Sequence, residues 1–374
     1  MIGLPRSDTS IVGCWWWTVD RWTLLALTLL IGLGVVLMMA ASPAAGGRIG
    51  LDGFQLAQRQ LMLVPVALVL MLAVSLLDPR WVRRLAVVGL AGSILLLAAT
   101  LAIGVEIKGA TRWIQLGGLS IQPSEFAKPC LTVTAAWLFA SGKLDPRFPG
   151  GLLASLLFAA VAGLVIAQPD LGQSFVIGAV WGLQLFLAGL SMPLVIGLAA
   201  AGIGVLVSSY FLLPHVASRV DRFLDPAAGD HYQVERSIEA FMNGGLWGRG
   251  PGEGTVKSLL PDSHSDFIFA VAGEELGLVA CLFIVALFAF VVLRGFARLL
   301  SDDSLFALLA GTGLIAQFGL QAIINMATAL RLMPTKGMTL PFISYGGSSL
   351  MALALGMGML LALTRKRVGR GEVT

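Results

Sequence analysis

Long apolar stretches, separated by short polar or Pro/Gly-containing breaks, make up most of this chain. Breaks such as Asp78-Pro79-Arg80 and Ser191-Met192-Pro193 are typical of turns. An α-helix needs roughly 20 apolar residues to cross a bilayer, and most of the stretches are close to that length. The ten stretches are residues 22–41, 60–77, 85–105, 126–140, 151–167, 172–190, 193–213, 268–293, 305–330 and 348–364. The pattern predicts an all-α polytopic membrane protein with about ten transmembrane helices.

The composition supports this prediction and excludes other classes of protein. Of the 374 residues, 57% are hydrophobic and only 12% are charged, whereas about a quarter are charged in ordinary soluble proteins. No large soluble domain fits between the stretches, so residues 1–374 are expected to form a single transmembrane domain. The net charge of +4 is scattered without a basic run, which argues against nucleic acid as a partner. The three cysteines show no C-x-x-C spacing, so we expect neither a disulfide framework nor a zinc site.

Basic residues near the ends of the stretches indicate the orientation of the chain. An even number of spans places both termini on one side, and Arg365-Lys366-Arg367 indicates that this side is cytoplasmic. When the long loop at 214–267 is left out, 13 basic residues fall inside and 7 outside. We therefore predict an uncleaved cytoplasmic N-terminus at 1–21, an extracytoplasmic loop at 214–267 and a cytoplasmic tail at 365–374.

Four polar motifs lie at the starts of even-numbered stretches, which begin at the outer face in this orientation. They are Gln122-Pro123-Ser124-Glu125, Gln168-Pro169-Asp170, His264-Ser265-Asp266 and the segment 344–349 that begins with Ser344. Helix capping alone explains Pro, Asp, Ser and Glu at such positions. It does not explain the cations predicted at the same face, which are Lys108, Arg112, Lys128, Arg219 and Lys336. Helix N-termini and cations together favour phosphate, so a lipid-linked phosphate or pyrophosphate is the expected substrate.

The loop at 214–267 is too long for a passive connection, which suggests a function. Val234, Ile238, Phe241 and Met242 recur at helical spacing, which predicts a short helix lying on the membrane surface. The Gly-rich stretch 244–254 is either a mobile gate or a flexible turn. The histidines His215, His231 and His264 match no metal-binding pattern.

Asp266 stands at the water boundary before the stretch 268–293, where a carboxylate could act as a general base. The alternative is that Asp266 only caps the following helix, which would stabilise its ionised form. Glu274 and Glu275 lie deeper in the same apolar stretch. They could orient Asp266 or pair with a Lys or Arg, and the sequence leaves both roles open.

The motifs together resemble the SEDS family of peptidoglycan glycan-strand polymerases, over most of the chain between about 108 and 349. The resemblance lies in Lys108-Gly109-Ala110-Thr111-Arg112-Trp113-Ile114, Gln122-Pro123-Ser124-Glu125-Phe126-Ala127-Lys128, Gln168-Pro169-Asp170-Leu171-Gly172, His264-Ser265-Asp266-Phe267-Ile268-Phe269 and Glu274-Glu275-Leu276-Gly277. The segment 334–347, with its Thr335-Lys336 pair, is more similar to the division-type members than to the elongation-type members.

The resemblance implies a ten-helix fold and a reaction outside the membrane. Lipid II units are joined into β-1,4-linked glycan, the growing chain being held by undecaprenyl pyrophosphate. Asp266 takes the position of the catalytic aspartate and accepts the proton of the attacking 4-hydroxyl. Candidates to bind the pyrophosphate are Lys108, Arg112, Arg219 and Lys336, each of which could instead anchor the chain at the membrane interface. Glu125, Lys128, Asp170 and Ser344 are further candidates for substrate binding, although a Glu125–Lys128 ion pair and a capping role for Asp170 explain them equally well.

The resemblance also implies partners and a location. A class B penicillin-binding transpeptidase and other divisome proteins are expected at the division septum of the bacterial inner membrane. No cofactor is evident; a divalent cation could assist the pyrophosphate, but the sequence shows no ligand set for one. Two rival functions are a lipid II flippase, supported by the polytopic architecture, and a non-catalytic scaffold for the transpeptidase.

Overall fold

The structure of this chain is a computed structural model. It describes residues 10–48, 53–107, 110–116, 119–212, 217, 221, 232–334 and 337–366. Lys108, Arg219 and Lys336, three of the predicted site residues, lie outside the described residues, as do His215 and His231.

Each of the ten predicted apolar stretches falls on a long helix of the described chain. These helices are α2 (Arg21–Arg48), α3 (Gln55–Ser75), α4 (Pro79–Ile103), α5 (Pro123–Leu144), α6 (Gly150–Ala167), α7 (Leu171–Leu187), α8 (Met192–Leu212), α11 (Ile268–Leu299), α12 (Leu305–Ala329) and α13 (Gly347–Leu363). Among the described residues, six helices are long and apolar enough to cross a membrane: α2, α3, α4, α6, α11 and α12. Large apolar side chains such as Met62, Leu95 and Phe211 face outward, as lipid contact requires.

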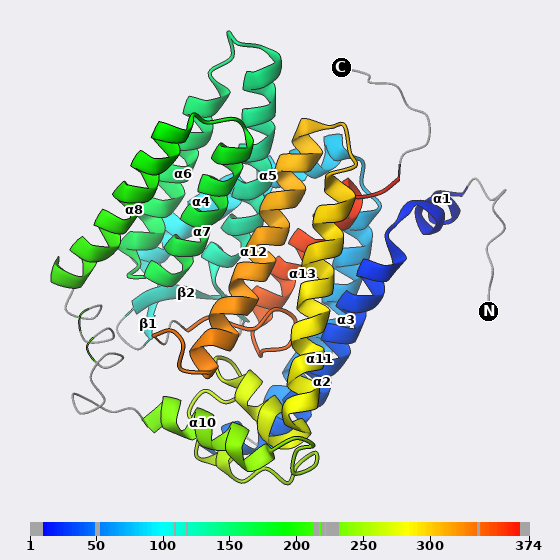
Figure 1. Cartoon of the computed structure of the whole chain (residues 1–374), viewed down its shortest axis with the longest axis vertical. Coiled ribbons are helices and arrows are strands. Elements are labelled where there is room, and N and C mark those ends of the chain that lie inside the picture. The colour runs from blue at the N-terminus through cyan, green and yellow to red at the C-terminus, as the bar shows by residue number, and fades with distance from the viewer. Residues whose placement is uncertain are drawn as a thin grey trace.

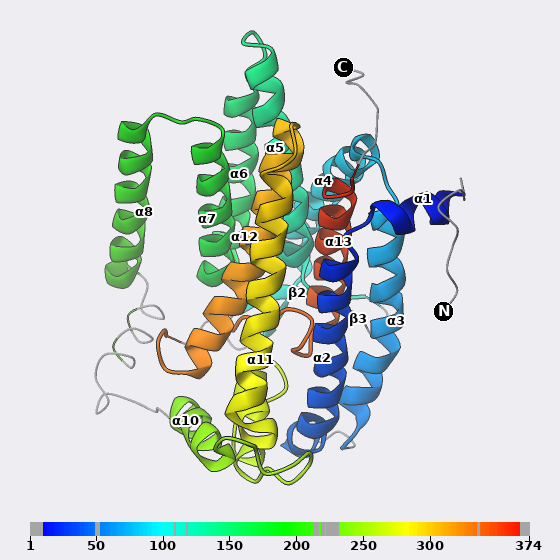
Figure 2. The same cartoon turned by 45° about the vertical axis from the view of Figure 1, so that its right-hand side comes forward.

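The long helices form one bundle around α5, α12 and α13 (Figures 1 and 2). α5 packs against α4, α6, α12 and α13 and is buried along most of its length. Figure 2 shows α8 at the edge of the bundle, where it contacts α7. The central helices can therefore carry polar side chains that the surrounding helices shield.

The described ends of the chain meet at one end of the bundle, called here the termini end. The short helix α1 (Ile11–Thr18) lies there across the bundle axis (Figure 2). The Lys366 amide donates to the Thr18 carbonyl at 3.1 Å, and Arg365 donates to the Thr18 hydroxyl and to the Leu76 carbonyl, each at 3.1 Å. These bonds join α1, the end of α3 and the end of α13.

A buried carboxylate, Asp20, joins α2 to α11 at the termini end. Arg294 donates to its two oxygens from Nε at 2.7 Å and from Nη2 at 2.9 Å. Arg298 pairs with it at 3.3 Å, and the Thr23 hydroxyl donates to it at 2.9 Å. Burial raises the pKa of Asp20, but the hydrogen bonds from Arg294 and Thr23 and the positive charges outweigh it, so the pKa lies below its usual value.

A small antiparallel sheet between α4 and α5 departs from the all-α prediction. Its strands are β1 (Val105–Ile107), β2 (Ala110–Leu116) and β3 (Leu119–Ile121), in the order β1-β2-β3. Val105 pairs with Trp113, and Ile114 pairs with Ile121. β-branched and aromatic residues favour such strands, but strands this short leave only a weak sequence pattern beside the apolar stretch that ends at 105. The sheet matters for function because it carries Arg112.

The predicted surface helix is α10 (Tyr232–Gly244), which packs against α11. Its Phe241 ring lies against Phe269 with centroids 5.6 Å apart, whereas Met242 is exposed. Ser237 donates to the Ala329 carbonyl at 2.6 Å, at the end of α12. The long loop is therefore joined to the bundle through both α11 and α12.

The Gly-rich stretch after α10 is bonded to a kink in α11. Gly277 has a φ of +78° inside this helix, a conformation that favours glycine. Beyond the kink, the amides of Leu278 and Val279 donate to the carbonyls of Gly245 and Leu246. The loop backbone thus accepts hydrogen bonds that an unbroken helix would satisfy internally.

Candidate functional site

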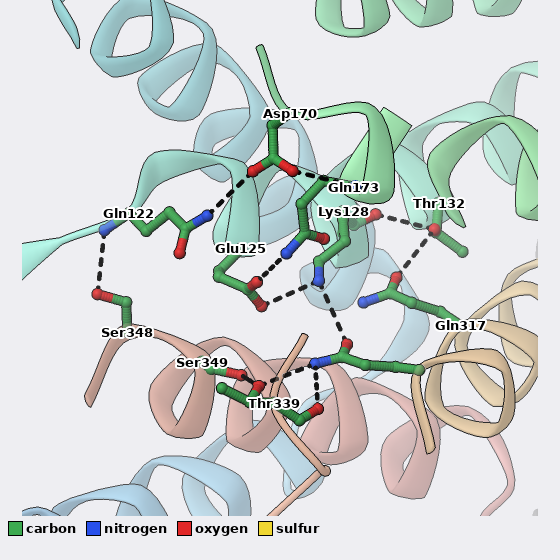
Figure 3. A network of polar contacts seen from close by, with 11 residues as sticks. Gln122, Glu125, Lys128, Thr132, Asp170, Gln173, Gln317, Thr339, Ser348 and Ser349 are labelled. Atoms are coloured by element: carbon green, nitrogen blue, oxygen red, sulfur yellow. Dashed lines mark hydrogen bonds and ion pairs between the residues drawn. The ribbon is translucent and has the colours of Figure 1, made fainter. Parts of the chain in front are cut away.

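Five of the long helices, α3, α5, α7, α11 and α13, begin at the end of the bundle opposite the termini end, called here the site end. The last four begin with the polar motifs of the sequence. The Gln122 amide, just before α5, donates to Ser348 Oγ of α13 at 3.0 Å. Gln122 Nε2 donates to Asp170, just before α7, at 3.4 Å. The Tyr345 amide, before α13, donates to the His264 carbonyl, before α11, at 2.9 Å. The four sequence motifs therefore meet in space, as Figure 3 shows for three of the helix starts.

Asp170 is the N-cap of α7, accepting a hydrogen bond from the Gln173 amide at 3.3 Å. It also pairs with Arg112 Nη1 at 3.6 Å, while Arg112 donates to the carbonyls of Gln168 and Pro169. Burial raises the pKa of Asp170, and the positive charge of Arg112 offsets only part of this rise. Arg112 on the sheet is thereby fixed against the start of α7.

Glu125 and Lys128 form a buried ion pair on one face of α5, with Lys128 Nζ 2.9 Å from Glu125 Oε2. The two residues are only 4% and 3% exposed. A buried pair is stable only when its remaining donors and acceptors are also satisfied. Gln173 Nε2 donates to Glu125 Oε1 at 2.5 Å, and Lys128 Nζ donates to Gln321 Oε1 at 3.2 Å. The pair thus connects α7 to α12 through α5 (Figure 3).

From Gln321 the network continues to the segment before α13. Gln321 Nε2 donates to both the carbonyl and the hydroxyl oxygen of Thr339, each at 3.2 Å. The Thr339 hydroxyl lies 2.7 Å from the Ser349 hydroxyl. A continuous set of polar contacts therefore runs from Arg112 to Thr339, three residues after Lys336.

Asp266 lies in the turn 261–267 that leads into α11, and it is half-buried. Phe267 takes the N-cap position of α11, so the alternative in which Asp266 caps this helix is wrong. Three successive carbonyls of the turn accept hydrogen bonds: that of His264 from the Tyr345 amide, that of Ser265 from Ser344 Oγ at 2.5 Å and that of Asp266 from Asn325 Nδ2 at 3.0 Å. The backbone of the turn is therefore fixed from two directions.

The Asp266 carboxylate lies beside Gly337. A Cβ atom at position 337 would be 3.6 Å from Asp266 Oδ2. Gly337 has a φ of +62°, which favours glycine at this close approach. Ser344, a predicted substrate-binding residue, is buried and also accepts from the Leu340 amide at 2.7 Å. Its hydroxyl therefore joins the Asp266 turn, through the Ser265 carbonyl, to the segment before α13, through the Leu340 amide.

Glu274 and Glu275 bind the loop before Asp266 and are themselves fully buried. Glu274 accepts hydrogen bonds from the amides of Thr255, Val256 and Lys257, at 2.7 to 2.8 Å. Glu275 pairs with the buried Lys257 ammonium. Of the two roles left open by the sequence, the described contacts of Glu275 match pairing with a lysine, whereas those of Glu274 are hydrogen bonds from amide groups.

No group of three or more His, Cys, Asp and Glu residues that could hold a metal is found in the parts of the chain that the structure describes. The acidic residues of the polar network pair with Lys or Arg and accept hydrogen bonds from amides. The pyrophosphate-binding cations predicted from sequence include one described residue, Arg112, whose side chain is 21% exposed.

Sequence reasoning missed the amides on α12. Gln317, Gln321 and Asn325 are buried and spaced four residues apart, so they share one face of an otherwise apolar helix. The sequence shows this spacing. It does not show which groups the three amides bind, because their partners come from α5 and from the segments around 266 and 338.

These observations define a multi-pass helical membrane protein with a polar network at one end, next to a turn that carries a half-buried carboxylate. Residues 21–368 match the family model described as cell cycle protein, for FtsW, RodA and SpoVE. The chain belongs to this family, the SEDS family, and its curated relatives place it with the FtsW type.

Curated relatives and solved structures match nearly the whole chain. The probable peptidoglycan glycosyltransferase FtsW of Caulobacter vibrioides is 46% identical over 365 residues, which cover 97% of this chain and 94% of that protein. The protein of the same name from Geobacter metallireducens is 35% identical over 366 residues, covering 94% and 96%. The rod shape determining protein RodA of Thermus thermophilus superposes with a TM-score of 0.69 at 29% identity, covering 93% and 97%. A chain of a peptidoglycan synthase complex superposes with a TM-score of 0.76 at 30% identity, covering 92% and 97%.

Proposed function

We propose that this protein is a peptidoglycan glycosyltransferase that polymerises lipid II for septal wall synthesis. The observation that carries the proposal is the position of Asp266. Its carboxylate stands half-buried beside Gly337, in a turn whose backbone is fixed by two other segments. The names of the FtsW relatives support the reaction class.

In this mechanism the growing glycan is the donor, attached through its anomeric carbon to undecaprenyl pyrophosphate. The 4-hydroxyl of the incoming lipid II attacks that carbon, and Asp266 accepts the hydroxyl proton. The new β-1,4 bond forms as the bond to pyrophosphate breaks, which inverts the anomeric configuration. Negative charge develops on the leaving pyrophosphate, so fixed cations beside it lower the barrier.

The predicted substrate residues divide into two groups. Arg112, partly exposed on the sheet, is a candidate to bind pyrophosphate, together with Lys108, Arg219 and Lys336. Glu125, Lys128, Asp170 and Ser344 are buried and engaged with protein groups. We propose that this second group holds the helix starts and the Asp266 turn in place without contacting substrate.

The proposed reaction requires a defined orientation in the membrane. All ten long helices cross the bilayer in this proposal, with residues 1–21 and 365–374 in the cytoplasm and 214–267 outside. The meeting of Thr18 with Arg365 and Lys366 supports placing both termini on one side. The site end then faces the periplasmic side of the bacterial inner membrane, at the septum.

The proposed partner is a class B penicillin-binding transpeptidase that cross-links the new strands, with further divisome proteins. The similar chain in a structure on polymerization and crosslinking by a peptidoglycan synthase complex supports such a pairing. A divalent cation could neutralise the leaving pyrophosphate.

The test is polymerisation of lipid II by the purified full chain, alone and with a transpeptidase. Asp266→Asn keeps the shape of the side chain but removes the base, so we expect the rate to fall about 10²- to 10⁴-fold. Glu253→Gln removes an exposed carboxylate from the same loop and should leave the rate unchanged. Full polymerisation by Asp266→Asn would exclude the proposed mechanism. Lipid II flipping by a chain that does not polymerise would favour a flippase, and unaltered septal synthesis with Asp266→Asn in cells would favour a scaffold.

A further inference from the structure

The three amides on α12 differ in what they contact. Gln317 and Gln321 meet Thr132 and Lys128 of α5. Asn325, one turn further along, lies next to the Asp266 turn instead. Because residues four apart lie on one face of a helix, this face of α12 runs from the polar network to the carboxylate of the proposed mechanism.

Asn325 joins two segments with one amide nitrogen. Its Nδ2 donates to the Asp266 carbonyl at 3.0 Å and to the Met338 carbonyl at 2.6 Å. An Asn amide has two donor protons, so both are used. The Asn325 residue is only 2% exposed, so its two bonds are formed with little competition from water. Loss of a buried hydrogen-bond partner is costly in such a place.

These two bonds set the spacing between Asp266 and the segment that follows Lys336. Met338 comes directly after Gly337, and Gly337 is the residue that lies beside the Asp266 carboxylate. The carbonyls on each side of this contact are therefore bonded to the same nitrogen atom. A shift of α12 or of either segment would change where the carboxylate stands.

The other bonds to the turn act from a different direction. Ser344 Oγ and the Tyr345 amide hold the carbonyls of Ser265 and His264 against the start of α13. Asn325 adds a bond from α12 to Asp266 itself. Two directions are needed because a turn held along one edge can still rotate about it.

We propose that Asn325 is a positioning residue for glycosyl transfer, which sets the distance between the Asp266 carboxylate and the 337–338 backbone. The proposal rests on the proposed function, in which Asp266 is the general base. A misplacement of reacting groups by about 1 Å can cost roughly 100-fold in rate. Asn325 is thus required for the orientation of the base and not for binding of lipid II.

The test compares Asn325→Leu and Asn325→Asp with the parent in full-length protein. Leu has no donor, and Asp has the same shape but at most one donor proton, so neither can serve both carbonyls. We expect kcat to fall roughly 10- to 100-fold in both variants, with the KM for lipid II within about twofold of the parent, because an orienting contact acts on the transition state. The second variant covers the case in which the first does not fold.

Gln184→Leu is the matched control. Gln184 Nε2 also donates to two backbone carbonyls of other helices, Thr132 at 2.9 Å and Leu309 at 3.1 Å, and the residue is equally buried. Leu309 lies 16 residues before Asn325 on α12, about 24 Å along a helix. Gln184→Leu should lower the melting temperature as much as Asn325→Leu does but leave kcat unchanged.

The outcomes separate this inference from the proposed function. A kcat within twofold of the parent in both Asn325 variants, or an equal loss of kcat in Gln184→Leu, would overturn the positioning role even if Asp266→Asn is inactive. Polymerisation that persists in Asp266→Asn would overturn the proposed mechanism, and the positioning role with it. Low kcat in the Asn325 variants, with inactive Asp266→Asn and active Gln184→Leu, supports both.

Discussion

The described contacts at the two ends of the bundle fix an aspartate through different atoms. At the termini end, Asp20 is held through its carboxylate, which accepts from Arg294 and Thr23 and pairs with Arg298. At the site end, Asp266 is held through its backbone carbonyl by Asn325. The two guanidinium groups around the Asp20 carboxylate join helices, whereas the bond to the Asp266 carbonyl fixes the backbone of the turn that carries this residue.

The polar groups around the two carboxylates differ in extent as well. The Asp20 cluster joins α2 to α11 and involves few residues. The network at the site end connects the sheet, α5, α7, α12 and α13 through successive contacts. Damage to the first should affect stability alone, whereas damage to the second should affect stability and activity together. Three predictions test this difference.

The largest effect on stability is expected for Lys128→Met. This change leaves Glu125 charged and buried without its partner, which typically costs about 3–5 kcal/mol. It also removes the donor to Gln321, so polymerisation per folded molecule should fall. Thermal unfolding in detergent and lipid II polymerisation measure the two effects. Adding Glu125→Gln removes the stranded charge and should restore most of the stability; if the double variant is as unstable as Lys128→Met, the buried charge is not the cause.

An intermediate effect is expected for Asp20→Asn. Hydrogen bonds to charged groups contribute about 1.5–3 kcal/mol, and part of this should be lost, whereas kcat of the folded protein should not change. The pKa of Asp20 is below its usual value of 3.8, so its contribution is present above about pH 4 and is lost as the pH falls through the lower, folded-state value. Unfolding measured against pH should show this acid-side loss in the parent and not in the variant. A kcat that falls with the stability would contradict the separation of the two ends.

The smallest effect is expected for Asp170→Asn. Asn is as good an N-cap as Asp, so the bond from the Gln173 amide is kept. The pKa of Asp170 in the folded protein is raised by burial. The unfolded chain therefore ionises first, and the fold loses stability as the pH rises from about 3.8 to the raised folded-state value. Removing the buried charge offsets the lost pairing with Arg112 and the loss of the long bond from Gln122 Nε2, so the free energy of unfolding at pH 7 should change by less than about 1 kcal/mol. A much larger loss at neutral pH would show that the Arg112 pair outweighs the burial of the charge.

The sequence predicted the positions of the long helices and the four motifs at their starts, and the structure brings these motifs together. It did not predict the small sheet, because strands of three, seven and three residues beside an apolar helix leave only a weak periodic pattern. It left the partners of Glu274 and Glu275 open, and these come from Asn243 and from the loop residues 252–257. The capping alternative for Asp266 was wrong by one residue, since helix ends are the least well defined part of a helix pattern.

What the sequence determined by itself is the arrangement of apolar segments, because a chain in lipid must satisfy its backbone within each helix and local hydropathy therefore defines the segments. What only the tertiary structure decided is which polar side chains meet. Asn325 and Asp266 are 59 residues apart, and Asp20 and Arg294 are 274 apart. Such contacts depend on how helices pack and rotate against one another, which no local pattern records.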